Sequence, residues 1–256
     1  MGKHRILILG GTTEARQLAT ALAQRADCDS LLSLAGRTAE PMVQPVATRS
    51  GGFGGSDGLA EFLKAGNFDL LIDATHPFAA RISNNAAIAA GSTGILFFAL
   101  RRAKWKQEPG DRWKSVRSIA DAVGALGTVP KRVFLAIGRQ EAFHFESAPQ
   151  HRYLIRSVDP VTPRLDIPQA DYILATGPFE EAAERQLLIE NRIDVIVAKN
   201  SGGTATYGKI AAARALDIAV IMVERQQPDD VRTVETVKDA LGLVDHLFSP
   251  EMKRGV

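Results

Sequence analysis

The residues best suited to chemistry in this chain lie directly after short apolar runs, where glycines and hydroxyl side chains come together. The first such segment is Gly10-Gly-Thr-Thr-Glu14, which follows the apolar residues 6–9. Glycines let a backbone approach a ligand closely, and the free N–H groups at the start of a helix attract an anion. The segment therefore predicts a phosphate site at the end of a strand. A tight turn without a ligand is the alternative, since the spacing departs from the G-x-G-x-x-G fingerprint.

A second segment, Leu34-Ala-Gly-Arg37, ends the next apolar run. In dinucleotide-binding folds this position meets the adenosine ribose, where an acidic residue selects NAD and an arginine accommodates the 2′-phosphate of NADP. No acidic residue follows Arg37 before Glu40. The sequence thus favours NADP if a dinucleotide binds, and a surface arginine without a ligand is the alternative.

A third segment, from Asp73 to Phe78, places a carboxylate, a hydroxyl and an imidazole after another apolar run. His76 is a candidate general acid, but a structural or cofactor-contacting histidine is the favoured interpretation. Pro77 is expected in the first turn of the following helix, where proline is tolerated. The predicted cofactor contacts in the three segments are Gly10, Gly11, Thr12, Thr13, Glu14, Gly36, Arg37, Thr75, His76, Pro77 and Phe78.

Four glycines surround one aromatic residue, Phe53, between residues 51 and 55. Glycines give a loop conformational freedom, so this stretch predicts a mobile flap with a single apolar tip. A lid over a functional site and a plain flexible loop are equally consistent with the pattern.

The second half of the chain has its own group of basic and glycine residues after apolar runs. Lys199-Asn-Ser-Gly-Gly203 follows the apolar residues 195–198, and Lys209 lies on the next predicted helix. Arg139 and Arg156 follow two other predicted strands. Glycines, hydroxyls and cations at strand ends predict a second anion site, although the order of residues is not that of a P-loop. A solvated surface position is the alternative for each basic residue.

The elements that must position these residues alternate between strands and helices. Several strands are continuous apolar runs, which indicates parallel sheets buried on both faces. Short segments of the first half recur in the same order in the second, as in Asp73-Ala-Thr-His-Pro-Phe78 and Ala175-Thr-Gly-Pro-Phe179. We therefore expect an α/β protein with two Rossmann-like, doubly wound parallel-sheet lobes and a cleft between them. The expected boundary lies between residues 128 and 129, and the terminal strand of each lobe, after a long polar connector, is free to pack on either lobe.

Composition excludes several classes of protein. The chain has 256 residues, of which 45% are hydrophobic, and a net charge of +2. No apolar run reaches the roughly 20 residues that span a bilayer, so we expect a cytoplasmic protein without membrane contact. The single cysteine, Cys28, allows no intramolecular disulfide, and no paired-cysteine or H-E-x-x-H pattern predicts a metal site.

One segment is strongly basic and includes Trp105 and Trp113. Interleaved basic and aromatic residues permit nucleic-acid binding, a solvated connector, or a rim that attracts a polyanionic small molecule. The connector and the rim are the favoured interpretations. The basic residues of the segment are Arg101, Arg102, Lys104, Lys106, Arg112, Lys114 and Arg117.

Taken together, these segments resemble the precorrin-6A reductase family of cobalamin biosynthesis over nearly the whole chain. The resemblance implies an NADPH-dependent reductase that reduces one carbon–carbon double bond of a tetrapyrrole to give precorrin-6B. It also implies a cofactor lobe at residues 1–128 and a precorrin lobe at residues 129–256, with guanidinium and ammonium groups for the substrate carboxylates. The segments that carry it are Leu9-Gly-Gly-Thr12, Ser33-Leu-Ala-Gly-Arg37, Gly51-Gly-Phe-Gly-Gly55, Asp73-Ala-Thr-His-Pro-Phe-Ala79, Gly138-Arg139, Leu154-Ile-Arg156 and Lys199-Asn-Ser-Gly-Gly203.

The resemblance extends to the roles of single residues. The polycarboxylate precorrin is the expected partner, and neighbouring enzymes of the cobalamin pathway are further expected partners, whereas nucleic acid is not. Expected substrate contacts are Arg16, Phe53, Gly54, Gly138, Arg139, Arg156, Lys199, Asn200, Ser201, Gly202, Gly203 and Lys209.

The chemical step leaves several alternatives open. Lys199 and His76 are the preferred catalytic residues, while the proton donor stays open between Asp73, His76, Lys199, Tyr207 and a water molecule. Spacing does not separate a metal-free substrate from a cobalt-containing one. A non-catalytic NADP-sensing protein is the alternative function.

Overall fold

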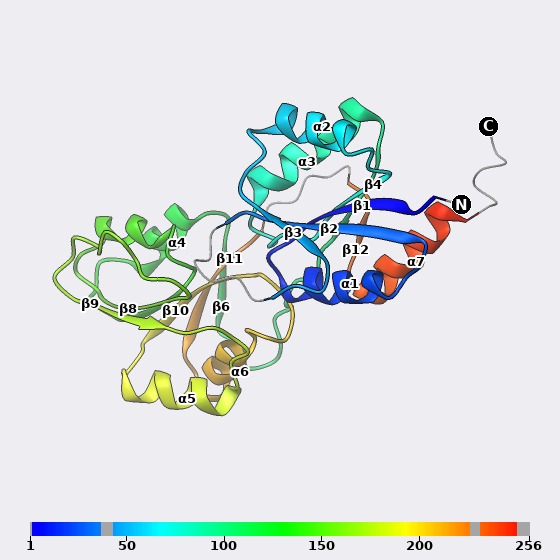
Figure 1. Ribbon diagram of the computed structural model, residues 1–256. Helices are drawn as coiled ribbons and strands as arrows, with labels where there is room; N and C mark the ends of the chain where they lie inside the picture. The colour runs from blue at the N-terminus through cyan, green and yellow to red at the C-terminus, as the bar shows by residue number, and fades with distance from the viewer. Residues whose placement is uncertain (1, 37–42, 226–230, 250–256) are drawn as a thin grey trace. The chain divides into compact units, whose positions relative to one another are not determined.

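The computed structural model describes residues 2–36, 43–225 and 231–249, and it divides the chain into two compact units. The first unit consists of Met1–Arg102 and Gln227–Val256, and the second of Ala103–Gln226. Each unit contains a six-stranded sheet with helices on both faces (Figure 1). All strand pairs in both sheets are parallel. The expected α/β class with two parallel sheets is therefore confirmed.

The sheet of the first unit has the strand order β12-β5-β4-β1-β2-β3. Its central strands are continuous apolar runs, and all four residues of β4 are buried because helices cover both faces. The edge strand β3 is short and mostly exposed, which is why the apolar pattern did not predict it. The strands are β1 (His4–Leu9), β2 (Cys28–Leu34), β3 (Ala47–Ser50), β4 (Leu70–Asp73), β5 (Leu96–Leu100) and β12 (Thr233–Val234).

Two pairs of helices cover this sheet. On one face α1 (Thr13–Ala23) packs beside α7 (Val237–Phe248), and on the other α2 (Ser56–Ala65) packs beside α3 (Ala80–Thr93). The strand order reverses between β1 and β4, so the connections after these two strands depart to opposite faces. Ligands of doubly wound sheets bind at such a reversal, beyond the carboxyl ends of the strands. The segments after Leu9 and Asp73 therefore meet where a ligand is expected.

The sheet of the second unit repeats this arrangement, with the strand order β6-β11-β10-β7-β8-β9. Its order reverses between β7 and β10. The strands are β6 (Trp113–Val116), β7 (Arg132–Ala136), β8 (Arg152–Ser157), β9 (Ala170–Leu174), β10 (Val195–Lys199) and β11 (Ala219–Val223). The helices are α4 (Ile119–Leu126), α5 (Glu181–Glu190), α6 (Gly208–Ala215) and the short 3₁₀ helix η1 (Ala142–Ser147).

The sixth strand of each sheet comes from the other half of the chain, which corrects the expected boundary. β6 precedes β7 in sequence but pairs with β11, so residues 103–128 belong to the second unit. β12 pairs with β5, where Ala99 N–H donates to the Arg232 carbonyl over 2.9 Å. The edges of β5 and β11 need a partner for their backbone hydrogen bonds, and these short strands supply one.

Candidate functional site

The loop after β1 has the geometry of an anion cradle. Thr12 caps α1, since its hydroxyl oxygen accepts a hydrogen bond from Ala15 N–H over 3.1 Å and donates to the Ala74 carbonyl over 2.9 Å. The loop after β1 is thereby joined to the end of β4. Gly11 has φ +116°, in the region that favours glycine, and a Cβ on Gly10 would lie 2.6 Å from Leu32 Cδ1. Gly11 is therefore favoured by its backbone conformation, whereas a side chain on Gly10 would displace the buried side chain of Leu32.

The polar groups behind this loop are held in ion pairs. Asp73 is fully buried, and its carboxylate accepts hydrogen bonds from the Thr75 hydroxyl at 2.6 Å and from Arg101 at 2.9 Å. Glu14, in the first turn of α1, binds Arg102 at 2.7 Å. Burial and pairing argue against Asp73 as a proton donor, and they give Glu14 a structural partner besides any cofactor.

His76 is exposed at the carboxyl end of β4. Its Nδ1 accepts a hydrogen bond from Phe78 N–H over 3.3 Å, which assigns the proton of the neutral ring to Nε2. Pro77 is buried in a turn before α3 rather than in the first turn of that helix, because α3 begins three residues later at Ala80. His76 is therefore a donor at the edge of the sheet.

A cavity of about 300 Å³ opens beside this edge in the first unit. The glycine loop at residues 51–55 forms one wall, and the first two turns of α3 contribute Arg81, Ile82 and Asn85. Ser33 and Ala35, at the end of β2, complete the polar and apolar lining. Among the residues that the structure describes, none forms a hydrogen bond or an ion pair with the side chain of Arg81. The cavity thus combines an apolar interior with one cation, as a nucleotide pocket does.

The glycine loop is fastened to the sheet rather than detached from it. The guanidinium of Arg49 donates to the Gly51 and Gly52 carbonyls, each over 3.1 Å, and to the Ser33 hydroxyl over 2.8 Å. It also lies 3.9 Å from the ring centroid of Phe53, which packs against Phe62. Burial lowers the pKa of Arg49, although arginine keeps its charge in proteins. Phe53, the apolar tip of the expected flap, therefore packs against Arg49 and Phe62, and both Phe53 and Gly54 line the cavity.

In the second unit Lys199 ends β10, and its ammonium group forms an ion pair with Glu141 in the loop after β7. Arg139, in the same loop, is exposed and lies 3.8 Å from Asp159. Because β7 and β10 are neighbours at the reversal of the strand order, these two cations follow neighbouring strands. This edge therefore holds two cations, and each has an acidic side chain beside it.

Two other predicted substrate contacts are buried and have their own partners. Arg156 forms two hydrogen bonds with Glu184 on α5, at 2.5 and 2.9 Å, and lies 3.7 Å from the ring centroid of Phe179. Lys209 donates to the Thr206 carbonyl and lies 4.8 Å from the ring centroid of Trp105. Both side chains support the fold, which argues against the expected role in binding carboxylates.

The segment after Lys199 holds Trp105, which lies in the connector from β5 to β6. The side-chain amide of Asn200 pairs with the Trp105 backbone, since its oxygen accepts from the N–H over 2.9 Å and its nitrogen donates to the carbonyl over 3.1 Å. The Trp105 indole N–H donates to the Gly203 carbonyl over 2.7 Å. Gly202 and Gly203 have φ +68° and +76°, and Ser201 is buried beside them. The loop after β10 therefore also holds the connector in place through its hydrogen bonds to Trp105.

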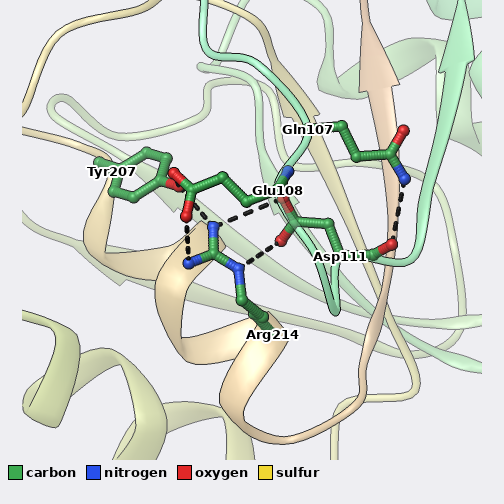
Figure 2. Close-up of polar contacts among 5 residues, drawn as sticks. All are labelled: Gln107, Glu108, Asp111, Tyr207 and Arg214. Carbon is green, nitrogen blue, oxygen red and sulfur yellow. Dashed lines mark hydrogen bonds and ion pairs between the residues drawn. The ribbon is translucent and has the colours of Figure 1, made fainter.

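The same connector is anchored to α6 by Arg214. Its guanidinium binds Glu108 and Asp111, each at 2.9 Å, and donates to the Tyr207 hydroxyl at 2.5 Å (Figure 2). Burial raises the pKa of Tyr207, and the hydrogen bond to Glu108 adds to the rise against the opposing effect of Arg214. Tyr207 is thus a member of a structural network, which makes it a poor candidate for the proton donor.

The basic segment around the two tryptophans is largely neutralised. Arg101, Arg102 and Arg112 pair with Asp73, Glu14 and Asp217, and Lys104 lies 3.9 Å from Glu224. These pairs favour the connector interpretation over a nucleic-acid surface.

Sequence reasoning named most residues at the two strand edges but missed Arg49, Arg81, Asn85 and Glu141. No local signal marks them, because each is defined by what it faces in the fold. Arg37 lies outside the described residues, and Gly36 ends the described part of that loop with φ +68°. Arg16 is exposed on α1, and Thr13 is exposed at its start. Gly138 follows β7 with φ +88°.

Within residues 2–36, 43–225 and 231–249, no group of three His, Cys, Asp or Glu side chains is placed to hold a metal ion. No helix in the same ranges is long and apolar enough to cross a membrane.

Comparison with known proteins gives consistent matches along the whole chain. The family described as precorrin-6x reductase CbiJ/CobK matches residues 5–245. A precorrin-6A reductase of Sinorhizobium sp is 64% identical over 250 residues, which cover 98% of this chain and 96% of the relative. A precorrin-6A reductase of Rhodobacter capsulatus is 45% identical over 253 residues, covering 98% of this chain and 99% of the relative.

More distant relatives and a solved structure extend these matches. A cobalt-precorrin-6A reductase of Priestia megaterium is 28% identical over 232 residues, covering 86% of this chain and 90% of the relative. The solved structure of a CobK precorrin-6A reductase superimposes with a TM-score of 0.92 at 43% identity, covering 99% of this chain and all of that one.

Proposed function

This chain belongs to the precorrin-6x reductase CbiJ/CobK family, and from that membership we infer that it reduces precorrin-6A with NADPH in cobalamin biosynthesis. The observation that carries this inference is the 64% identity to a precorrin-6A reductase over 98% of the chain. Relatives named for the cobalt-containing substrate are 27–28% identical, so the metal-free precorrin is the better supported substrate. Cytoplasmic localisation stays part of the proposal and is supported by the single cysteine.

The first unit is proposed to hold the cofactor. The residues present fit a dinucleotide, because Gly11 has a backbone conformation that favours glycine, a side chain on Gly10 would press on Leu32, and the N–H groups of Thr13 and Glu14 begin a helix without intrahelical acceptors. The neighbouring cavity is large enough to admit a nucleotide base and carries Arg81. NADPH, when bound, supplies hydride. Thr12, which ties the loop after β1 to the end of β4, keeps the cradle in place.

The second unit is proposed to bind the precorrin carboxylates, chiefly through Lys199 and Arg139. A proton must reach the carbon next to the one that receives hydride. Because Asp73 and Tyr207 are engaged in structural contacts, His76 and Lys199 stay as the protein candidates for that donor. The NADP-sensing alternative is not supported by the comparisons, since the named relatives are reductases.

The direct test of the function is a spectrophotometric assay. Mixing the purified protein with NADPH and precorrin-6A is expected to cause a loss of absorbance at the nicotinamide band that requires both the protein and the precorrin. NADH is expected to support a much slower reaction. No loss of absorbance with active, NADPH-binding protein would contradict the assignment.

If the cavity holds the adenosine part of NADPH, Arg81 is the cation placed to bind the 2′-phosphate, and this makes a separate prediction. Replacing Arg81 by alanine is expected to weaken binding of adenosine 2′,5′-bisphosphate about tenfold to a hundredfold, because one charged hydrogen bond contributes about 1.5–3 kcal/mol. Binding of adenosine 5′-monophosphate should change little. Isothermal titration calorimetry measures both.

Lys64→Ala is the matched control for Arg81. It removes one positive charge from the last turn of α2, at the opposite edge of the same sheet. The assignment of Arg81 is wrong if both variants bind the bisphosphate as the wild type does, or if Arg81→Ala weakens both nucleotides equally.

A further inference from the structure

Lys199 has a carboxylate partner within the protein itself. Its ammonium group pairs with the carboxylate of Glu141, which lies in the loop between β7 and η1. The side chain of Lys199 is 13% exposed and that of Glu141 is 31% exposed, so solvent reaches the pair at the edge of the sheet. Glu141 was not among the residues that the sequence pointed to.

The chemistry of this partner matches that of the proposed ligand. A glutamate side chain ends in the same carboxylate as a propionate or acetate substituent of a tetrapyrrole. The side chain of Lys199 is mostly buried, so its ammonium group needs a counter-charge, and a substrate carboxylate that replaces Glu141 supplies one. Lys199 can therefore exchange one carboxylate for another, and Glu141, which is 31% exposed, is released where solvent reaches it.

We propose that Glu141 is an internal competitor for Lys199, which holds the ammonium group until a carboxylate of the substrate displaces it. This inference rests on the proposed function of the second unit. Nearby Arg139 and Asp159, 3.8 Å apart, repeat the arrangement of a cation and an acidic residue at the same edge. The pairing keeps the edge nearly neutral when no substrate is bound. A ligand with one carboxylate then gains little binding free energy. A polycarboxylate makes several contacts at once, and these offset the cost of displacing Glu141.

The test replaces Glu141 by glutamine, which keeps the shape and removes the charge. E141Q is expected to lower the KM for precorrin-6A about three- to tenfold, because the substrate no longer competes for a paired cation. The KM should also rise more steeply with KCl than in the wild type, since one more unpaired positive charge attracts the polyanion. The Kd for NADPH serves as an internal reference and should stay constant.

Asp171→Asn is the matched control. It removes one negative charge from an exposed ion pair of the same unit, with Arg152 at 2.9 Å, at the start of β8 and β9 rather than at their carboxyl ends. Its KM for precorrin-6A should equal that of the wild type. An equal decrease in both variants would mean that net charge alone is responsible, and it would overturn the proposal.

The dependence on Lys199 is tested in a Lys199→Met background. In that background E141Q should no longer tighten the binding of precorrin-6A. Tryptophan fluorescence in the presence of NADP⁺ measures this binding even if the double variant is inactive. A decrease that persists without Lys199, an unchanged KM in E141Q, or a loss of kcat at constant KM each overturns the proposal. A wild-type protein that fails to oxidise NADPH with precorrin-6A would instead contradict the proposed function itself.

Discussion

Replacing Arg156 by alanine is expected to destabilise the second unit by about 3–5 kcal/mol, since removal of one partner leaves a buried, unpaired charge. That charge is Glu184, of which 3% is exposed and which receives two hydrogen bonds from the guanidinium. The variant also loses the contact of the guanidinium with the Phe179 ring. Urea unfolding followed by far-UV circular dichroism measures the change.

Arg139→Ala is the comparison that separates structure from binding. Arg139 is exposed and lies 3.8 Å from Asp159, so its loss should change stability much less than the loss of Arg156. It should instead raise the KM for precorrin-6A with little change in kcat, as expected for a residue that binds substrate and transition state equally. Arg156 is a substrate ligand after all if Arg156→Ala is as stable as the wild type and shows the same rise in KM.

Replacing Asp73 by alanine is expected to destabilise the first unit by a similar amount, about 3–5 kcal/mol. The carboxylate is fully buried and pairs with Arg101, whose side chain is 5% exposed. Without Asp73 the guanidinium is buried without a counter-charge, and the Thr75 hydroxyl loses its acceptor. Thermal unfolding with and without NADPH measures the loss and tests whether the folded fraction still binds the cofactor.

Asp29→Ala provides the matched control for this pair. Asp29 lies in the same sheet, is 57% exposed and is 3.4 Å from Arg5, so its removal should change stability by no more than about 1 kcal/mol. The double variant Asp73→Leu with Arg101→Met should recover part of the lost stability, because apolar groups of similar volume can replace a buried ion pair. Equal melting temperatures for Asp73→Ala and Asp29→Ala would show that the buried pair does not stabilise the unit.

These results would narrow the search for the proton donor. The sequence left four side chains as candidate proton donors, and two of them form structural contacts in the fold. Asp73 is paired with Arg101, and Tyr207 is bound by Arg214 and Glu108. His76 and Lys199 are the two protein groups on which pH profiles of kcat should concentrate.

Features that depend on near neighbours in the chain were predictable from the sequence. Continuous apolar runs identified the buried parallel strands, such as β4 and β10, because such strands are covered on both faces. Hydroxyl side chains cap three helices at Thr12, Ser118 and Thr236, and each accepts a hydrogen bond from the N–H three residues on, which is a contact between near neighbours in the chain. The glycine pair after β1 predicted the tight loop there, because glycines allow a backbone path that other residues disfavour.

Features that depend on which segments meet across the fold were decided only by the tertiary structure. The sequence left open which sheet β6 and β12 join, since a two- or four-residue edge strand carries too little pattern to choose a partner. The sequence indicated Arg156 as a substrate contact without indicating its buried partner Glu184, and it did not indicate Glu141. Whether a cation faces solvent or a buried carboxylate depends on a residue far along the chain, as with Arg156 and Glu184 at a separation of 28 residues. Charge type and strand position follow from the local sequence, but the partner of a charge, and hence its function, follows from packing.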